Sequence, residues 1–361
     1  MISYSQWGNE LYSGKRSYNI AGRGKLFLAI AAGLMLLSIL LLGFRGLNPS
    51  IEFTGGTQFI VSQAQTPNPQ LAEQVLKDNG LVENTRATSL GTTGVRVQTA
   101  PLESGEMADI RAGLAETYDV PLDDVQTNSV GATWGQDVTK KALQSIVIFV
   151  VLVAALMTVY FRSWAMSAAA MLSLLNDLLV TIGFFSLTQV EVSPATVIGF
   201  LTILGYSLYD TVVVFDKVRE VTKGYLDQER YTFSELVNLG VNQTLVRSIN
   251  TSVVAILPIA SILFIGSFVL GAGTLTDISL ALFVGLTVGA VSSIFVASPA
   301  LAMIEGSKAR TKAHTQQILA KRAADGVDAP DMEGTAEIVV APTVPGKRLS
   351  NAAQPKRKKR R

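Results

Sequence analysis

The chain has almost none of the side chains that carry thiol and imidazole chemistry. Its 361 residues include no cysteine and a single histidine, His314, in a charged stretch near the C-terminal end. A chain without cysteine forms no disulfide and no thiolate metal site, and zinc sites rest mainly on Cys and His ligands. We therefore expect no metal and no cofactor. Any group that transfers protons inside the chain must be a carboxylate, a hydroxyl or water.

Charged residues are scarce as well, at 16% of the chain against 48% hydrophobic residues. The apolar residues form blocks about as long as the 20 helical residues that cross a hydrocarbon core of roughly 30 Å. The first block is too long for the apolar core of a signal peptide, so we expect it to remain as a helix. The pattern predicts a polytopic α-helical membrane protein with six transmembrane helices, at Leu26–Phe44, Ala142–Phe161, Met166–Leu187, Ala195–Phe215, Ile249–Phe268 and Asp277–Ile304.

The basic residues are distributed unevenly between the connecting segments. Lys and Arg occur in the N-terminal segment 1–25, in loop 216–248 and in tail 305–361, whereas 188–194 and 267–276 contain none. The positive-inside rule then places both termini in the cytoplasm. Segment 45–141, with seven basic and twelve acidic residues, lies on the outer side.

The tail is rich in alanine, proline and charge, and it ends in a basic cluster at 356–361. This composition predicts a disordered cytoplasmic tail. Its basic end is expected to bind anionic lipid head groups, at about 1 kcal/mol per close charge. Contact with ribosomal RNA is the alternative, and specific DNA binding is not expected.

The outer segment 45–141 has the pattern of a small folded domain. Strand-like runs at 57–62, 83–90, 95–99 and 125–130 alternate with helical runs at 69–79 and 105–118. The order β-α-β-β-α-β predicts one α+β, ferredoxin-like exterior domain between the first two transmembrane helices. Nothing in it resembles a catalytic triad, so the domain can equally be a folded unit without chemistry of its own.

Asp210 is the most informative residue, because it lies within the fourth apolar block. A carboxylate at that depth costs roughly 2.5–3.5 kcal/mol on insertion scales, and it needs a partner, a water-filled cavity or a function. Arg247, at the start of the fifth block, is the candidate partner, and Tyr206 and Ser207 share a helical face with Asp210. The pair predicts a proton pathway through Asp210 and Arg247.

Other interpretations of these intramembrane residues stay open. The Asp210–Arg247 pair can instead be a static salt bridge between two helices. Asp177, in the third block, is either a second protonatable site or a helix-packing residue, and Asn250 is a further candidate for support. Two membrane aspartates also suggest an intramembrane aspartyl protease, but the residues before Asp177 do not form the Gly-x-Gly-Asp motif of that class.

The last apolar block carries small residues at every fourth position. They include a strict GxxxG at Gly285 and Gly289, between Ala281 and Ser293. Such a ridge lets another helix approach closely. We therefore expect Gly285 and Gly289 to pack against a neighbouring transmembrane helix.

Five ordered stretches resemble the SecF family, which is similar in plan to half of a transporter of the RND superfamily. The resemblance covers roughly residues 26–304 and is strongest in the fourth block, Gly205–Glu220. The stretches are Glu52–Gly56, Val130–Gly135, Gly205–Glu220, Asn242–Ser248 and Gly285–Phe295. The resemblance implies family motifs at Gly55, Gly56, Gly131 and Gly135.

The resemblance also implies a function. SecF proteins pair with a SecD homologue and associate with the SecYEG channel in the bacterial cytoplasmic membrane. Together they use the proton motive force to promote late steps of preprotein translocation. On this basis Asp210 matches the proton-carrying aspartate of the family and Arg247 matches its partner arginine. The chain is then a non-enzymatic accessory subunit of protein export.

The sequence departs from the family pattern at three places, and two other functions remain. The residue before the key aspartate is usually Asn in the family and is Tyr209 here. The first motif usually has Asp at the position of Glu52, and the third block usually reads His-Asp where this chain has Asn176-Asp177. The last change puts a relay role for the third helix in doubt. The alternatives are a structural subunit that stabilises SecD through a static Asp210–Arg247 clamp, and an RND-like exporter of small molecules or lipids. An exporter would carry two large exterior domains, and this chain carries one.

Overall fold

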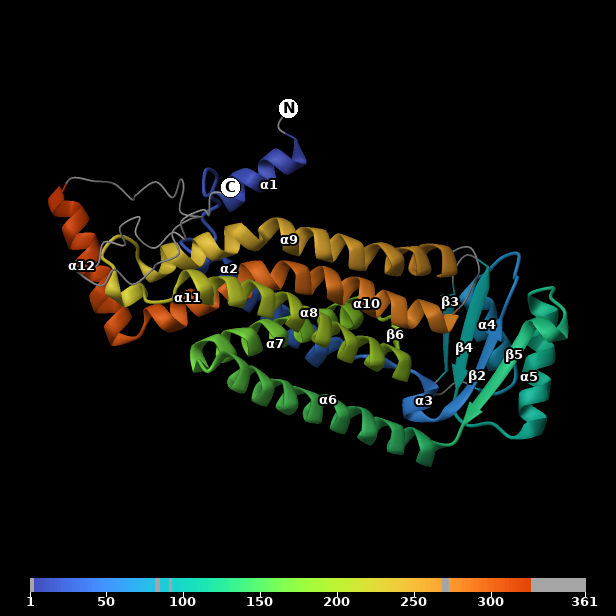
Figure 1. Ribbon diagram of the computed structural model, residues 1–361. Coiled ribbons are helices and arrows are strands. Elements are labelled where there is room, and N and C mark those ends of the chain that lie inside the picture. The colour runs from blue at the N-terminus through green and yellow to red at the C-terminus, as the bar shows by residue number, and fades with distance from the viewer. Residues whose placement is uncertain (1–2, 82–84, 91–92, 268–272, 326–361) are drawn as a thin grey trace, which may run out of the picture.

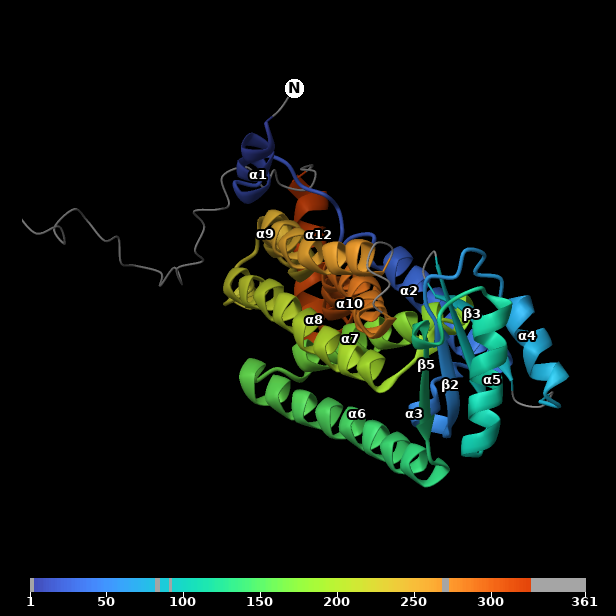
Figure 2. The same cartoon turned by 90° about the vertical axis from the view of Figure 1, so that its right-hand side faces the viewer.

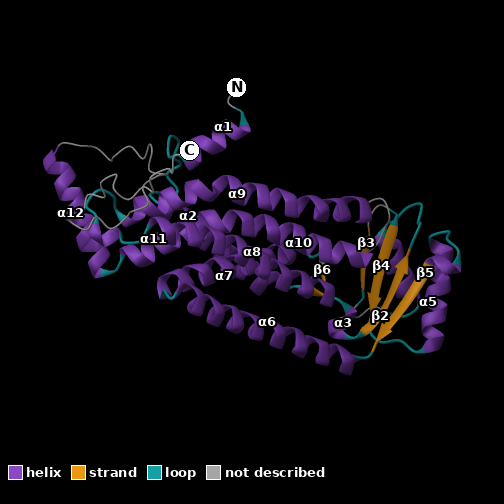
Figure 3. Cartoon of the chain, in the orientation of Figure 1, coloured by secondary structure: helices purple, strands orange, loops and turns teal. Residues whose placement is uncertain are grey.

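We describe the protein from a computed structural model, which covers residues 3–81, 85–90, 93–267 and 273–325 (Figure 1). The end of the fifth predicted block at Phe268, the start of the predicted strand at 83–84 and the tail beyond residue 325 lie outside these described residues. The chain forms a bundle of long helices with a sheet at one end (Figures 1 and 3), and that sheet has four strands.

Six helices in the described part of the chain are long and apolar enough to cross a membrane, which confirms the predicted six-span fold. A helix suits this environment because it satisfies its own backbone hydrogen bonds. Two spans contain π-helical turns, Ile262–Ser267 after α9 and Ser293–Ala297 between α10 and α11. The spans are built from α2 (Gly24–Arg45), α6 (Ala132–Phe161), α7 (Trp164–Thr188), α8 (Pro194–Val221), α9 (Phe233–Ser261), and α10 (Gly273–Ser292) continued by α11 (Ser298–Gly306).

Two of these helices begin earlier than their apolar blocks. Helix α6 starts at Ala132 rather than Ala142, and α9 starts at Phe233 rather than Ile249. Thr232 caps α9 by accepting a hydrogen bond from the Glu235 amide, while the Glu235 side chain bonds the Thr232 amide in return. This capping box starts the helix well before its apolar part. Much of the predicted loop 216–248 is therefore helix.

The exterior domain has the predicted ferredoxin-like topology. Its antiparallel sheet has the strand order β3-β4-β2-β5, which is the split βαβ arrangement. Helices α4 and α5 cover one face, and Phe59, Val97 and Leu114 are fully buried between the helices and the sheet. The elements are β2 (Gly56–Val61), α4 (Pro69–Asp78), β3 (Arg86–Leu90), β4 (Gly94–Thr99), α5 (Ser104–Thr117) and β5 (Val125–Val130).

Short elements join this domain to the bundle. Strand β1 (Asn48–Pro49) follows α2 and pairs in parallel with β6 (Glu191–Val192), the turn between α7 and α8. Helix α3 (Ile51–Thr54) then ends at Gly55 and Gly56, whose φ angles of +76° and +134° disfavour any residue with a Cβ atom. Gly135 lets α6 approach α3, since a Cβ atom there would lie 2.7 Å from the Phe53 carbonyl oxygen. A Cβ atom at Gly131 would meet nothing within 4 Å.

The opposite end of the bundle carries α1 (Tyr4–Tyr12) and α12 (Ala309–Asp325), as Figures 1 and 2 show. The predicted tail disorder is therefore wrong for residues 309–325. Thr311, His314 and Ile318 are buried on one face of α12, and Arg322 forms an ion pair of 2.7 Å with Glu235 of α9. The polar composition of the tail concealed this helix, because only one face of it packs.

Candidate functional site

The small-residue ridge of α10 lies directly against α8. A Cβ atom at Gly285 would lie 2.7 Å from both γ carbons of Ile203, and one at Gly289 would lie 3.0 Å from the Cβ of Ser207. The absence of side chains at these two glycines brings the helix backbones close together. The next member of the ridge, Ser293, consequently reaches Asp210.

Asp210 is 4% exposed and is held by serine hydroxyls from two other segments. Ser248 of α9 donates a hydrogen bond of 2.9 Å to its Oδ1. Ser293, the first residue of the π-helical turn, donates one of 2.5 Å to its Oδ2. A π-helical turn inside an α-helix rotates the side chains that follow it and is frequent at functional sites. Both carboxylate oxygens therefore have a neutral hydroxyl partner.

The predicted contact between Asp210 and Arg247 is not formed. The Arg247 side chain is exposed, and no ion pair joins it to any carboxylate within the described ranges. Successive residues of an α-helix point about 100° apart, since a turn takes 3.6 residues. Because Ser248 faces Asp210, its neighbour Arg247 must face elsewhere. The static Asp210–Arg247 clamp is therefore not present in this structure.

Asp177 of α7 is a second buried carboxylate close to the first. It is fully buried, and Ser207 of α8 donates a hydrogen bond to its Oδ2. The Asn176 amide lies 3.5 Å from its Oδ1. Ser207 stands one helical turn before Asp210, so the hydroxyl predicted to support Asp210 binds the other aspartate instead.

A pair of serines lies next to the residues of this site. Ser173, one turn before Asp177, shares a hydrogen bond of 2.5 Å with Ser292, the residue before Ser293. A serine hydroxyl donates one hydrogen bond and accepts others. It can donate to an ionised carboxylate or accept a proton from a neutral acid, so the site can accommodate either protonation state without moving the backbone. The arrangement suits binding and release of a proton.

Two other predicted support residues bind elsewhere. The Tyr206 hydroxyl donates a hydrogen bond of 2.8 Å to the backbone carbonyl of Thr251 on α9. The Asn250 side chain accepts one of 2.6 Å from the Tyr4 hydroxyl of α1. These contacts hold α8 and α1 against α9, and neither reaches a buried carboxylate.

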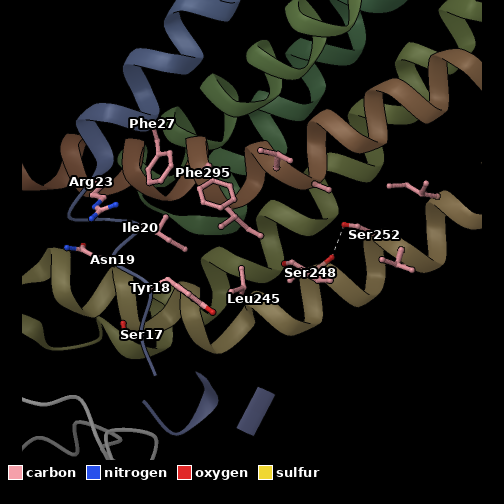
Figure 4. Close-up of a pocket in the computed structure, with 16 residues that line it drawn as sticks. Ser17, Tyr18, Asn19, Ile20, Arg23, Phe27, Leu245, Ser248, Ser252 and Phe295 are labelled. Atoms are coloured by element: carbon pink, nitrogen blue, oxygen red, sulfur yellow. Dashed lines mark hydrogen bonds between the residues drawn. The ribbon is translucent and has the colours of Figure 1, made fainter. Parts of the chain in front are cut away.

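A groove of about 690 Å³ reaches the site from the end of the bundle that carries α1 and α12. Figure 4 shows it between the N-terminal segment, α9 and the π-helical turn of α10. Ser248 lines this groove and also binds Asp210, so the hydroxyl lies between the carboxylate and the groove. Arg23 and Asn19 line it beside the start of α2, and the rings of Phe27 and Phe295 pack 5.0 Å apart on its wall.

Sequence reasoning missed Ser248 and Ser293 as partners of Asp210. Ser293 carried a usable signal, because it continues the spacing of the glycine ridge by one more step. Ser248 carried a weaker one, next to Arg247, whose charge drew the prediction. Among the described residues, no group of three or more His, Cys, Asp and Glu side chains could hold a metal ion.

Comparison with known proteins assigns the family. The family described as protein export membrane protein SecD/SecF, C-terminal, matches residues 111–307, and the SecD/SecF GG motif matches residues 40–62. The protein translocase subunit SecF of Streptomyces coelicolor is 41% identical over 91% of this chain and 88% of its own. The SecF subunit of Mycobacterium tuberculosis is 36% identical over 89% of this chain and 74% of its own.

A solved structure agrees with the fold. The crystal structure of SecDF, a translocon-associated membrane protein from Thermus thermophilus, superimposes with a TM-score of 0.73 at 28% sequence identity. The match covers 82% of this chain and 39% of the SecDF chain, so this chain spans about two fifths of that protein. From these matches and the six-span fold with its exterior sheet, the chain belongs to the SecF branch of the SecD/SecF family of protein-export membrane proteins.

Proposed function

We propose that the chain is an accessory subunit of the Sec protein translocase and that proton transfer at Asp210 drives its action on preprotein export. The observation that carries the proposal is the setting of Asp210. It is a buried carboxylate with hydroxyl partners on both oxygens, and one of those hydroxyls lines a groove. A group that must gain and lose a proton needs such reversible partners and a route to water.

The groove gives that route on the side of α1 and α12. Its volume of about 690 Å³ is large enough for several waters, since one water occupies about 30 Å³, and Asn19, Arg23 and Ser248 supply polar groups along a wall that is otherwise mostly apolar. When protonated Asp210 releases its proton to the Ser248 oxygen, the Ser248 hydroxyl turns and gives its own proton to a water in the groove, so the serine stays neutral. The proton enters from the opposite side of the membrane, past the second carboxylate, Asp177.

In this proposal a second subunit covers the face of α9 that carries Arg247. The exposed guanidinium of Arg247 on α9 is costly in a membrane without a partner, and a SecD-type subunit covering this face would supply one. The Thermus protein named SecDF supports this arrangement, because the matched region is only 39% of its chain. We extend the proposal to the SecYEG channel and a translocating preprotein as further partners, with a non-enzymatic role for this subunit.

The orientation follows from the charge distribution. We place the protein in the bacterial cytoplasmic membrane as a multi-pass subunit with both termini in the cytoplasm and the sheet domain outside. The basic residues of α12 and of segment 1–25 support this placement. Anionic lipid head groups near the basic tail are the expected surroundings of the inner end.

The test is preprotein translocation into vesicles that contain this chain, its SecD-type partner and the channel. Asp210→Asn keeps the size of the side chain and removes its charge cycle. We expect it to abolish the part of translocation that depends on a proton gradient, with normal recovery of the complex. The matched control is Asp216→Asn, which removes an exposed carboxylate from the same helix. Gradient-dependent translocation that survives Asp210→Asn would contradict the proposal.

A further inference from the structure

Strand β4 of the exterior domain presents two polar side chains to the membrane bundle. Side chains alternate between the two faces of a strand. Val95 and Val97 of β4 are fully buried under α4 and α5. Arg96 and Gln98 therefore point to the other face of the sheet, the one on the side of the helix bundle (Figure 1).

Both side chains end on the same carboxylate. The Arg96 guanidinium forms an ion pair with Oε2 of Glu191, and the two side chains are only 9% and 8% exposed. The Gln98 amide donates a hydrogen bond of 2.7 Å to Oε1 of the same residue. The exterior domain thus holds both oxygens of Glu191. Removing one partner of a buried ion pair leaves an uncompensated charge, so the contact resists separation.

Glu191 lies where the carboxylate-bearing helices meet. It belongs to β6, the turn between α7, which carries Asp177, and α8, which carries Asp210. Two residues later, Ser193 caps α8, and the side chains of Ser193 and Arg96 both lie near the buried carboxyl of Asp277, close to the start of α10. Helix α10 leads in turn to Ser293, the hydroxyl partner of Asp210. Three helices of the proton site therefore begin or end beside one ion pair.

The helices are long enough to connect this joint to the proton site. Asp210 lies about 24 Å along α8 from its first residue, Pro194, at 1.5 Å per residue. A long helix moves nearly as a rigid rod, so a change in the contacts of Asp210 shifts both of its ends. A shift of α8 relative to α7 or α10 moves the Glu191 turn, and the ion pair transfers that movement to the sheet.

We infer that Arg96 and Glu191 are positioning residues that couple the proton site between the membrane helices to movement of the exterior domain. This inference rests on the proposed function, because it assigns the path by which proton transfer reaches the domain outside. The ion pair itself neither carries the proton nor touches the translocating chain. Loss of the ion pair should leave proton uptake in place while reducing the preprotein translocation that uptake drives in the intact protein.

The experiment measures two rates in the same vesicles, which contain this chain, its SecD-type partner and the channel. One rate is proton uptake down an imposed gradient, and the other is preprotein translocation. For Arg96→Gln we expect proton uptake that still depends on Asp210, with about fivefold or more fewer preproteins translocated per proton, within the usual range of coupling between sites. The control Lys77→Gln removes an exposed charge of the same domain and should leave the ratio unchanged.

The charge-swapped variant, Arg96→Glu with Glu191→Arg, keeps an ion pair at the same place. We expect it to restore a large part of the ratio, which a merely unfolded domain would not allow. An unchanged ratio in Arg96→Gln would overturn the inference, and so would a swap that restores nothing. Failure of the proposed function would be seen in a different variant, because it would appear as proton uptake that stays intact in Asp210→Asn.

A second measurement covers the case in which Arg96→Gln does not fold. Because the chain has no cysteine, spin labels can be placed selectively at the exposed positions Glu116→Cys on α5 and Val254→Cys on α9. Their distance distribution should change when a proton gradient is imposed on the labelled complex. Glu191→Gln, which keeps the shape of the side chain, should remove that change, and a change that persists in Glu191→Gln would overturn the inference.

Discussion

One methyl group at Gly285 should disturb the proton site from two helical turns away. In Gly285→Ala the new Cβ atom would lie 2.7 Å from both γ carbons of Ile203, whereas carbon atoms pack at about 3.5–4.0 Å. A rotamer change does not remove the overlap. The two γ carbons of Ile203 occupy two of three staggered positions, and both of these positions clash with the new Cβ atom. Any other rotamer moves only one γ carbon to the third position, so at least one clash remains.

The helices must therefore separate by about 1 Å, the difference between the clashing distance and normal carbon packing. Ser293, directly after the end of α10, is eight residues further along the same span, about 12 Å away, and it moves with the helix. A displacement of this size would stretch its 2.5 Å hydrogen bond to Asp210 to about 3.5 Å, the limit of such a bond. Overpacking of this kind also costs about 1–3 kcal/mol of stability.

The assay is thermal unfolding of the purified protein together with proton uptake in vesicles. We expect Gly285→Ala to lower both the unfolding midpoint and the rate of uptake. The control is Gly205→Ala on α8, where a Cβ atom meets nothing within 4 Å. Alanine favours the helix there by up to about 1 kcal/mol. The packing argument is refuted if the two variants have the same midpoint and the same uptake.

Two more predictions concern the inner end of the bundle. Ser248→Ala removes the hydroxyl between Asp210 and the groove, so proton uptake should slow by about tenfold, the effect of losing one hydrogen bond of about 1.4 kcal/mol. The control is Ser252→Ala, which should not slow uptake because the Ser252 hydroxyl donates to a backbone carbonyl. Equal uptake rates in the two variants would contradict the role given to Ser248. Arg322→Gln breaks the ion pair that holds α12 on α9, so trypsin should cleave α12 faster than in the control Lys312→Gln, and equal cleavage would show that the ion pair does not hold α12.

The fold was predictable because its signals are strong and local. Six apolar blocks of membrane length leave few alternatives to six helices, and alternation along β4 separates Val95 and Val97 from Arg96 within a short stretch. Asp210 was predictable for the same reason, since an isolated charge in an apolar block is rare. The start of α9 was not, because it depends on a capping box, in which Thr232 and Glu235 lie outside the apolar block.

The partners of Asp210 depend on helix rotation and close packing, which the sequence does not state directly. Arg247 was the electrostatic choice, but α9 turns Ser248 toward the carboxylate and leaves Arg247 exposed. Ser293 reaches Asp210 from a π-helical turn, and Ser207 of α8 donates its hydrogen bond to Asp177 of the neighbouring helix α7. Serines are common in transmembrane helices, so only the folded arrangement distinguishes the ones that matter.

The central claim is that Asp210 changes its protonation state while the protein works. Infrared difference spectroscopy measures this directly, because a protonated carboxyl has a carbonyl stretch that a carboxylate lacks. The complex with its SecD-type partner would be held in oriented membranes while a proton gradient is switched on and off. The account predicts a carboxyl band that appears and disappears with the gradient in the wild-type protein and is missing in Asp210→Asn. A band that persists unchanged in Asp210→Asn, or no band change in the wild-type protein, would contradict it.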